Sequence, residues 1–353
     1  MIPIVFDKTA TSFNNLGLGG VSDALDCIVT EERNKSFTLS LTAPANSARA
    51  DDLAVGNIIV ADASPLQRMQ AFDIVSVDES LDRIEVTAEH LSYRLGYALV
   101  KPFSVNGITA MISKLNTAAT WVGDTLPGFS FASSGITSAA TCALANYETG
   151  RNVLGGVRGS MLDTYGGTWQ FDNFTATLYA SRGTGSGLRI IYGKNLKAVS
   201  AEYDLTDTIT GVFGVWTQND APVVTTSQIW ETANASSYPF PRNVIHDFAD
   251  EFQSQPTQAQ LDTAAAAWIS GKGDPSMNLT LDWIPLSQTI EYKDIPSGVI
   301  GIDDTVQIYI HPLGIYTSAK CIATQYNALL DRYESVQVGN FRETLADAIR
   351  RLK

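Results

Sequence analysis

Histidine and cysteine are the side chains of this chain best suited to nucleophilic or metal chemistry, and there are three of each. They are His90, His246, His311, Cys27, Cys142 and Cys321. A zinc hydrolase places two histidines on one helix face, as in His-Glu-x-x-His, and a zinc knuckle needs closely spaced cysteines, so the spacing predicts neither site. We expect three buried thiols from a reducing compartment. A Cys–His pair assembled by folding stays open as an alternative.

Neighbouring carboxylates are the next candidates, because two carboxyl groups about 5 to 9 Å apart can hydrolyse a glycoside. They occur at Glu31, Glu32, Asp51, Asp52, Asp303 and Asp304, and again at Asp247, Asp250 and Glu251. Such clusters are typical of solvated turns. The glycine-rich run 183–187 lacks the Lys-Ser/Thr of a phosphate-binding loop and lies between two expected strands, which favours a hairpin loop. We therefore predict no catalytic residue, no metal site and no cofactor.

Composition places the chain among folded proteins of several packed units. Its 353 residues exceed one ordinary core, and hydrophobic residues make up 44% against 17% charged. The net charge of −13 argues against a nucleic-acid-binding surface, because such a surface depends on an excess of lysine and arginine. No segment approaches the ~20 apolar residues of a membrane span, and no basic leader precedes an apolar run at the N-terminus. We expect a soluble chain without stable membrane insertion.

The elements that position these side chains are mainly strands in the first half of the sequence. Alternation of polar and apolar residues predicts hairpins at 26–44, 71–87 and 169–179. Helical spacing predicts one helix over 108–115 with Asn106 as its N-cap. A second helix is predicted over 153–165, ended by a left-handed Gly166.

The second half is predicted to contain strands, one long loop and two helices. Residues 222–256, which are rich in proline, are predicted to be loop-like, a helix is expected over 258–270, and strands are expected between 277 and 326. An apolar stripe predicts an amphipathic helix after residue 339 that docks on its own chain or on a neighbour. The candidate interface residues of this helix are Phe341, Leu345, Ile349 and Leu352.

Several runs together resemble the N-terminal region of phage minor structural proteins, also called prophage tail endopeptidases or tail-associated lysins. The run 26–44 is similar to the family's strand, Glu-Arg-Asn turn, strand and proline pattern, although Lys35 stands where the family usually has glycine. The runs 70–77 and 84–95 are similar to a strand pair that leads into a helix carrying His90, Tyr93 and Leu95. The match continues, in the family's order, through the runs 161–174, 182–183, 191–196, 281–286, 301–306 and 333–339.

The resemblance implies an α+β, β-rich, multi-domain fold similar to the central hub of contractile-tail baseplates. In that fold, two β-barrel domains are accompanied by α+β domains. We accordingly expect a first β-barrel hub domain at 1–104 and an α+β domain at 105–195. A second β-barrel hub domain at 196–338, with a loop and helical insertion around 222–275, precedes the terminal helix at 339–353.

The resemblance also implies a structural protein, not an enzyme, at the virion tail tip of a bacteriophage or prophage, assembled in the host bacterial cytoplasm. Such a baseplate hub closes the tail tube and opens for DNA ejection. Its expected partners are further copies in a homotrimer, the distal tail protein, the tape-measure protein and receptor-binding or lytic tail modules. Viral DNA passes through without specific binding. In the family, peptidoglycan cleavage usually belongs to a domain after this region, so no catalytic residue is carried over.

Two other functions compete with the structural one. The family name and the acidic pairs suggest a peptidoglycan hydrolase or endopeptidase of the tail tip. The six tryptophans and thirteen tyrosines suggest a carbohydrate-binding host-recognition module, because aromatic rings stack on sugars.

Overall fold

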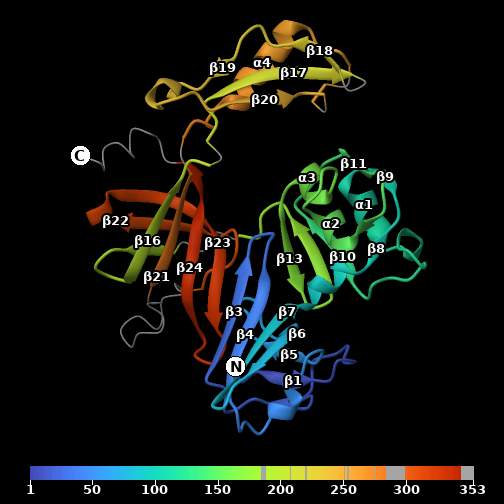
Figure 1. The fold of residues 1–353 in the computed structure, drawn as a ribbon, viewed down its shortest axis with the longest axis vertical. Helices are drawn as coiled ribbons and strands as arrows, with labels where there is room; N and C mark the ends of the chain where they lie inside the picture. Colours follow the sequence, from blue (N-terminus) through green and yellow to red (C-terminus); the bar gives the residue numbers. More distant parts are fainter. Residues whose placement is uncertain are drawn as a thin grey trace. The chain divides into compact units, whose positions relative to one another are not determined.

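The computed structural model of the chain describes residues 1–183, 188–206, 208–218, 221–249, 251–252, 254–274, 276–283 and 299–342. The chain divides into two compact units (Figure 1). Unit 1 comprises residues 1–198, 281–309 and 320–338, and unit 2 comprises residues 199–280, 310–319 and 339–353. The segments 1–104 and 105–195 both fall in unit 1, and the division into four consecutive domains stays a prediction.

Alternating burial builds the main sheet of unit 1. Every second residue is buried in β3 (Asp26–Glu32), β4 (Phe37–Pro44) and β7 (Arg83–His90). The strands follow the order β24-β23-β3-β4-β7-β6-β5-β1-β2. The remaining strands of this order are β1 (Ile4–Phe6), β2 (Gly19–Gly20), β5 (Ile58–Ala61), β6 (Gln70–Glu79), β23 (Ile315–Asn327) and β24 (Arg332–Arg342). The hairpins predicted at 26–44 and 71–87 are confirmed as β3–β4 and β6–β7.

The described strands do not form the expected barrels. β3 pairs with β23 on one side and with β4 on the other, so the N-terminal hairpins continue directly into the C-terminal strands (Figure 1). Among the strands that the structure describes, no pairing joins β2 back to the opposite end of this order. The β-rich fold class is therefore confirmed, whereas the two closed barrels are not.

An α+β layer completes unit 1. Its strands are β8 (Leu99–Val100), β9 (Phe103–Asn106), β10 (Ser130–Ser134), β11 (Thr141–Leu144), β12 (Glu148–Thr149), β13 (Thr168–Asp172) and β14 (Thr175–Tyr179). β15 (Arg189–Ile191) pairs with β22 (Thr305–Ile310), and β22 pairs with β23 of the main sheet. Its helical segments are a 3-10 turn at Leu91–Gly96, α1 (Ile108–Leu115), α2 (Gly150–Leu154) and α3 (Met161–Tyr165). They share a core around Trp121, Met111 and Trp169. The resemblance places a helix at His90, and the structure has the shorter 3-10 turn there.

The two helices predicted for this layer form with different ends. The first is α1, but its N-cap is Gly107, at φ 83°, while Asn106 belongs to β9 and its side chain accepts a hydrogen bond from Thr141. The prediction of one continuous helix over 153–165 is wrong, because α2 and α3 are separate helices. Gly156 and Gly159, at φ 111° and 81°, interrupt the helical backbone between them. α3 ends at Gly166, as predicted, but with φ 66° and ψ −158° this glycine does not take the left-handed helical conformation.

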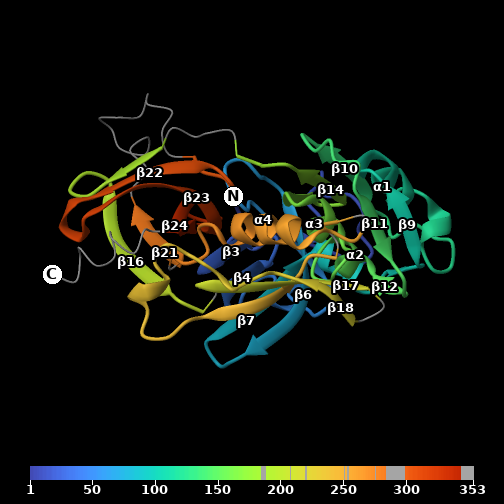
Figure 2. The same cartoon turned by 90° about the horizontal axis from the view of Figure 1, so that it is seen from above.

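Unit 2 contains a small sheet covered by one helix. Its strands are β17 (Gly211–Gln218), β18 (Ala221–Thr225), β19 (Trp230–Glu231) and β20 (Asn243–Asp247). β16 (Leu196–Asp204) and β21 (Ser276–Trp283) belong to the long sheet instead, in the order β16-β21-β24. The predicted helix 258–270 is confirmed as α4 (Gln258–Ile269), which begins with a capping box from Thr257 and Gln260. It packs its buried face on the sheet around β17 (Figures 1 and 2). The loop predicted over 222–256 is wrong, because β18, β19 and β20 form there.

The predicted terminal helix lies mostly outside the described residues. Strand β24 continues through Arg342, so Phe341 lies in a strand and not in the first turn of a helix. Leu345, Ile349 and Leu352 lie outside the described residues, and their helix stays a prediction. In the part of the chain that the structure describes, no helix has the length and apolar character to span a membrane.

Candidate functional site

A buried ion pair between Arg182 and Glu31 includes one of the carboxylates considered as candidates in the sequence. Arg182 Nη1 lies 2.5 Å from Glu31 Oε1, and both side chains are about nine-tenths buried, at 10% and 9% exposure. Arg182 also donates to Gln67 Oε1 at 3.1 Å and to the Trp169 carbonyl at 3.3 Å. The guanidinium is thereby held by three partners from different parts of the sequence.

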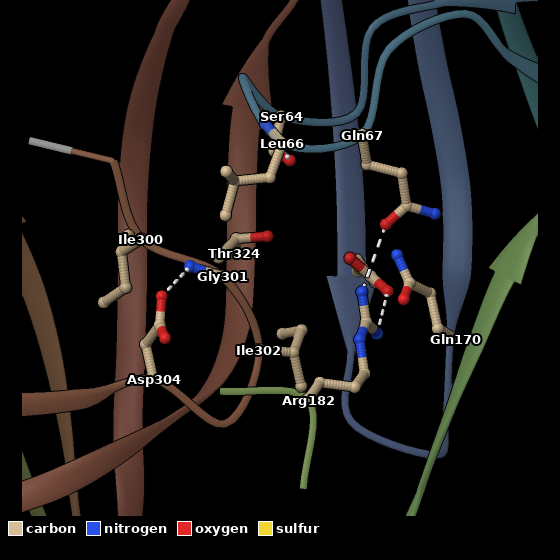
Figure 3. A pocket seen from close by; sticks show the side chains of 11 residues that line it. Ser64, Leu66, Gln67, Gln170, Arg182, Ile300, Gly301, Ile302, Asp304 and Thr324 are labelled. Atoms are coloured by element: carbon tan, nitrogen blue, oxygen red, sulfur yellow. Dashed lines mark hydrogen bonds and ion pairs between the residues drawn. The ribbon is translucent and has the colours of Figure 1, made fainter. Parts of the chain in front are cut away.

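A cavity of about 140 Å³ in unit 1 adjoins this pair (Figure 3). It is lined by Glu31, Ser64, Leu66, Gln67, Gln170, Arg182, Ile300, Gly301, Ile302, Asp304 and Thr324. The second carboxylate at this cavity is that of Asp304, which accepts a hydrogen bond from the Gly301 amide at 2.8 Å. Two of the predicted acidic pairs thus each contribute one member to the same cavity.

The Glu-Arg-Asn turn binds the β13 end of the α+β layer. Arg33 Nε lies 2.9 Å from Asp303 Oδ1 and donates to Thr168 Oγ1 at 2.9 Å. Asn34 donates to the Gly167 carbonyl at 3.0 Å and accepts from the Trp169 amide at 2.9 Å. The turn therefore joins sequence runs that are more than 130 residues apart.

The departure at Lys35 from the family pattern has a structural explanation. Asn34 itself takes the left-handed conformation, at φ 56°, and asparagine tolerates this region better than most residues. The chain can therefore reverse direction at this turn without a glycine at position 35. Of the glycine-rich run, Gly183 is described, and a Cβ there would lie 2.1 Å from the Asp303 carbonyl oxygen. Residues 184–187 lie outside the described residues.

Removal of the Asn34 side chain is expected to weaken this junction. Asn34→Ala should lower the free energy of unfolding by about 2 kcal/mol, because two hydrogen bonds are lost and alanine is strained at positive φ. Asn34→Gly should cost less, because glycine accepts the backbone conformation. Lys35→Ala is the matched control and should change stability by less than about 0.5 kcal/mol, since Arg151 binds only the Lys35 carbonyl. Urea unfolding of the four proteins measures this, and equal stability of Asn34→Ala and the parent would contradict it.

The other acidic candidates lie apart from the cavity. Asp51 and Asp52 belong to a 3-10 turn at Ala50–Asp52, where Asp52 pairs with Arg49. In unit 2, Asp247 binds Thr217, and Glu251 lies 3.4 Å from His246. Asp250 lies outside the described residues.

The described cysteines and histidines do not form a nucleophilic site. All three cysteines are free and buried, as predicted. Burial raises the pKa of Cys27 to about 12 and raises the pKa of Cys142 and Cys321, which disfavours the thiolate. The rings of His90, His246 and His311 contact aromatic side chains. Within the described ranges, no group of three His, Cys, Asp or Glu residues is placed to hold a metal ion.

The six tryptophans are all buried or half-buried. Trp121, Trp169, Trp216 and Trp283 are buried. Trp268 is half-buried and is covered by the His246 ring at 4.3 Å and by Lys272 Nζ at 3.3 Å. The remaining one, Trp230, is half-buried and donates to Asp262. Four of the six indoles therefore stabilise the cores, and the other two are half-buried.

Comparisons with known proteins agree with this architecture. The sequence model of the prophage endopeptidase tail family matches residues 184–349. The fold is similar to that of prophage tail protein gp18 from Listeria monocytogenes, with a TM-score of 0.59, 14% identity, and coverage of 100% of this chain and 98% of that one. A tail protein from Neisseria meningitidis is also similar, with a TM-score of 0.59, 10% identity, and coverage of 96% of this chain and 97% of that one. A 43 kDa tail protein of prophage MuSo2 from Shewanella oneidensis is similar too, with a TM-score of 0.59, 12% identity, and coverage of 89% of this chain and 93% of that one. No curated protein matches the sequence.

Proposed function

We propose that the chain is a structural baseplate hub at the phage tail tip, because residues 184–349 match the model of the prophage endopeptidase tail family and the full chain has a fold similar to that of prophage tail proteins. The observation that carries the proposal is the likeness in fold over 98% of the length of a tail protein. In this function the hub closes the tail tube, connects it to host-recognition or lytic modules, and opens for DNA ejection. Its place is the tail tip of the virion.

The geometry around Arg182 supports a structural function over a catalytic one. A hydrolase that used Glu31 and Asp304 would need at least one carboxylate free to exchange a proton with substrate. Here Glu31 is held by Arg182, and Asp304 accepts the Gly301 amide. The contacts of Arg33 and Arg182 join the N-terminal hairpin to β13 and to Asp303 before β22, which suits a protein that must keep its shape in an assembly.

The family name makes peptidoglycan cleavage the competing function, and a direct assay separates the two. We expect the purified chain to produce no clearing in zymography on bacterial cell walls. The matched sample is the same gel loaded with an active lysin. Clearing by this chain that persists after repurification would overturn the structural assignment.

The assembly expected of a hub is a homotrimer bound to the distal tail protein above, the tape-measure protein inside and receptor-binding or lytic modules below. Cyclic closure would also cover sheet edges that a monomer leaves open. A trimer meets a sixfold tube only if each chain presents two similar domains, and the two proposed hub domains at 1–104 and 196–338 would supply them.

Stoichiometry tests this assembly. In a complex with the distal tail protein, mass photometry or electron microscopy should find three copies of this chain on a six-copy ring. The distal ring alone is the reference mass. A stable dimer, or one copy of this chain for each ring subunit, would show the proposed arrangement to be wrong.

A further inference from the structure

A second hollow in unit 1 lies beside the β6–β7 hairpin, apart from the Arg182 cavity. It is a groove of about 650 Å³, within the size range of ligand sites. Buried Leu53 and Ile84 line it together with half-buried Val77. Val55, which is 64% exposed, also lines it. The groove thus offers apolar contact area to an incoming chain.

The backbone of β6 is open along this groove. β5 pairs with β6 only from Gln70 to Asp73, and Ile74 then exchanges hydrogen bonds with Asn57 and Gly56. From Ser76 to Glu79, β6 pairs with β7 on one side. Among the described strands, none pairs with this stretch on the other side. An unpaired edge beside a groove with both apolar and acidic lining is a geometry that can bind an extended segment as an added strand.

The charge around the groove indicates which kind of extended segment can bind there. Asp51 and Glu79 line it, and both are exposed. The nearby cations are already paired, since Arg49 lies 3.2 Å from Asp52 and Arg83 lies 3.1 Å from Asp82. A partner would therefore bring lysine or arginine to the groove. With a net charge of −13, a second copy of this chain is poorly suited to supply it.

We propose that this groove binds an extended, basic segment of a neighbouring tail subunit, which adds a strand to the open edge of β6. Apolar residues of the segment face Val77 and Val55, and its basic residues pair with Asp51 and Glu79. The proposal rests on the proposed function only in calling the partner a tail subunit. The binding itself is measured on this chain alone, so its failure is distinguishable from failure of the trimer.

The probe is a seven-residue peptide of alternating lysine and valine, titrated into the full chain by calorimetry at low salt. We expect a dissociation constant on the order of 100 µM, together with slowed hydrogen exchange of the amides at 75–79. The double variant Asp51→Lys/Glu79→Lys should weaken binding about tenfold or more. The matched control, Glu202→Lys/Glu231→Lys, reverses two exposed charges in unit 2 and should bind like the parent.

Two further peptides separate strand addition from simple charge attraction. The same sequence with every backbone amide N-methylated cannot donate to a strand edge, and the glutamate-valine analogue carries the wrong charge. Both should fail to bind. No binding of the lysine-valine peptide at 1 mM, or equal binding of its N-methylated form, would overturn the proposal.

Discussion

Replacement of Arg182 by methionine should lower the free energy of unfolding by about 3–5 kcal/mol, the largest effect that we expect from a single substitution in this chain. The loss arises mainly because Glu31 remains buried without its ionic partner. Glu31 would lose its cation with only 9% of its side chain exposed, and a buried carboxyl group without its ionic partner is strongly destabilising. Gln67 and the Trp169 carbonyl would lose their donor as well. Urea unfolding measures the change.

The double variant Arg182→Met/Glu31→Met separates the ion pair from its surroundings. Because both charges are then absent, it should be more stable than Arg182→Met alone by about 1–3 kcal/mol. Arg83→Met is the control at an exposed pair, where both side chains are at least half exposed, and should cost less than about 1 kcal/mol. Equal losses for Arg182→Met and Arg83→Met would show that burial does not govern this pair.

The strands and helices that the sequence predicted correctly are those with local signals. The hairpins at 26–44 and 71–87 show strict alternation, and α4 begins with the Thr257 and Gln260 capping pair that precedes an apolar face. The segment 222–256 lacks such a signal. Its strand β20 pairs in parallel with β17, at Gly211 with Asn243, and periodicity cannot reveal a partner more than thirty residues away.

The candidate site was beyond sequence reasoning for the same reason. Glu31 belongs to an acidic pair in the sequence, but its partner Arg182 lies 151 residues later, directly before the glycine-rich run. Gln67 carried no signal at all. What could have indicated the junction is the set of separate runs in the family resemblance, since the turn at Arg33 and the segments at 168 and 303 meet there.

The buried histidine of unit 1 should make stability depend on pH below neutrality. His90 is fully buried, stacked on Phe37 at 4.3 Å, and its Nδ1 accepts the Ser92 amide. Burial, with a smaller contribution from the positive charge of Arg151, lowers the pKa of His90 from 6.5 to about 3. The folded state therefore keeps the ring neutral over a pH range in which the unfolded chain protonates it.

The sign of the effect follows from proton binding. Above about pH 6.5 neither state holds the proton, and the full stability is present. Below it, only the unfolded state binds the proton, so stability falls by about 1.4 kcal/mol per pH unit until the folded pKa is reached. Between about pH 6.5 and 4.5 the chain should lose roughly 2–3 kcal/mol from His90 alone.

His90→Asn isolates this contribution, because asparagine can still accept the Ser92 amide but does not titrate. The variant should be less stable than the parent at pH 8, through lost ring packing, and the gap should close by about 2–3 kcal/mol at about pH 4.5. Carboxylates titrate in both proteins and cancel in the difference. Phe72→Leu is the matched control, since it removes a ring that contacts His90 at 5.5 Å but keeps the histidine, and its gap to the parent should stay constant with pH. A constant gap for His90→Asn as well would mean that His90 is protonated without loss of the fold.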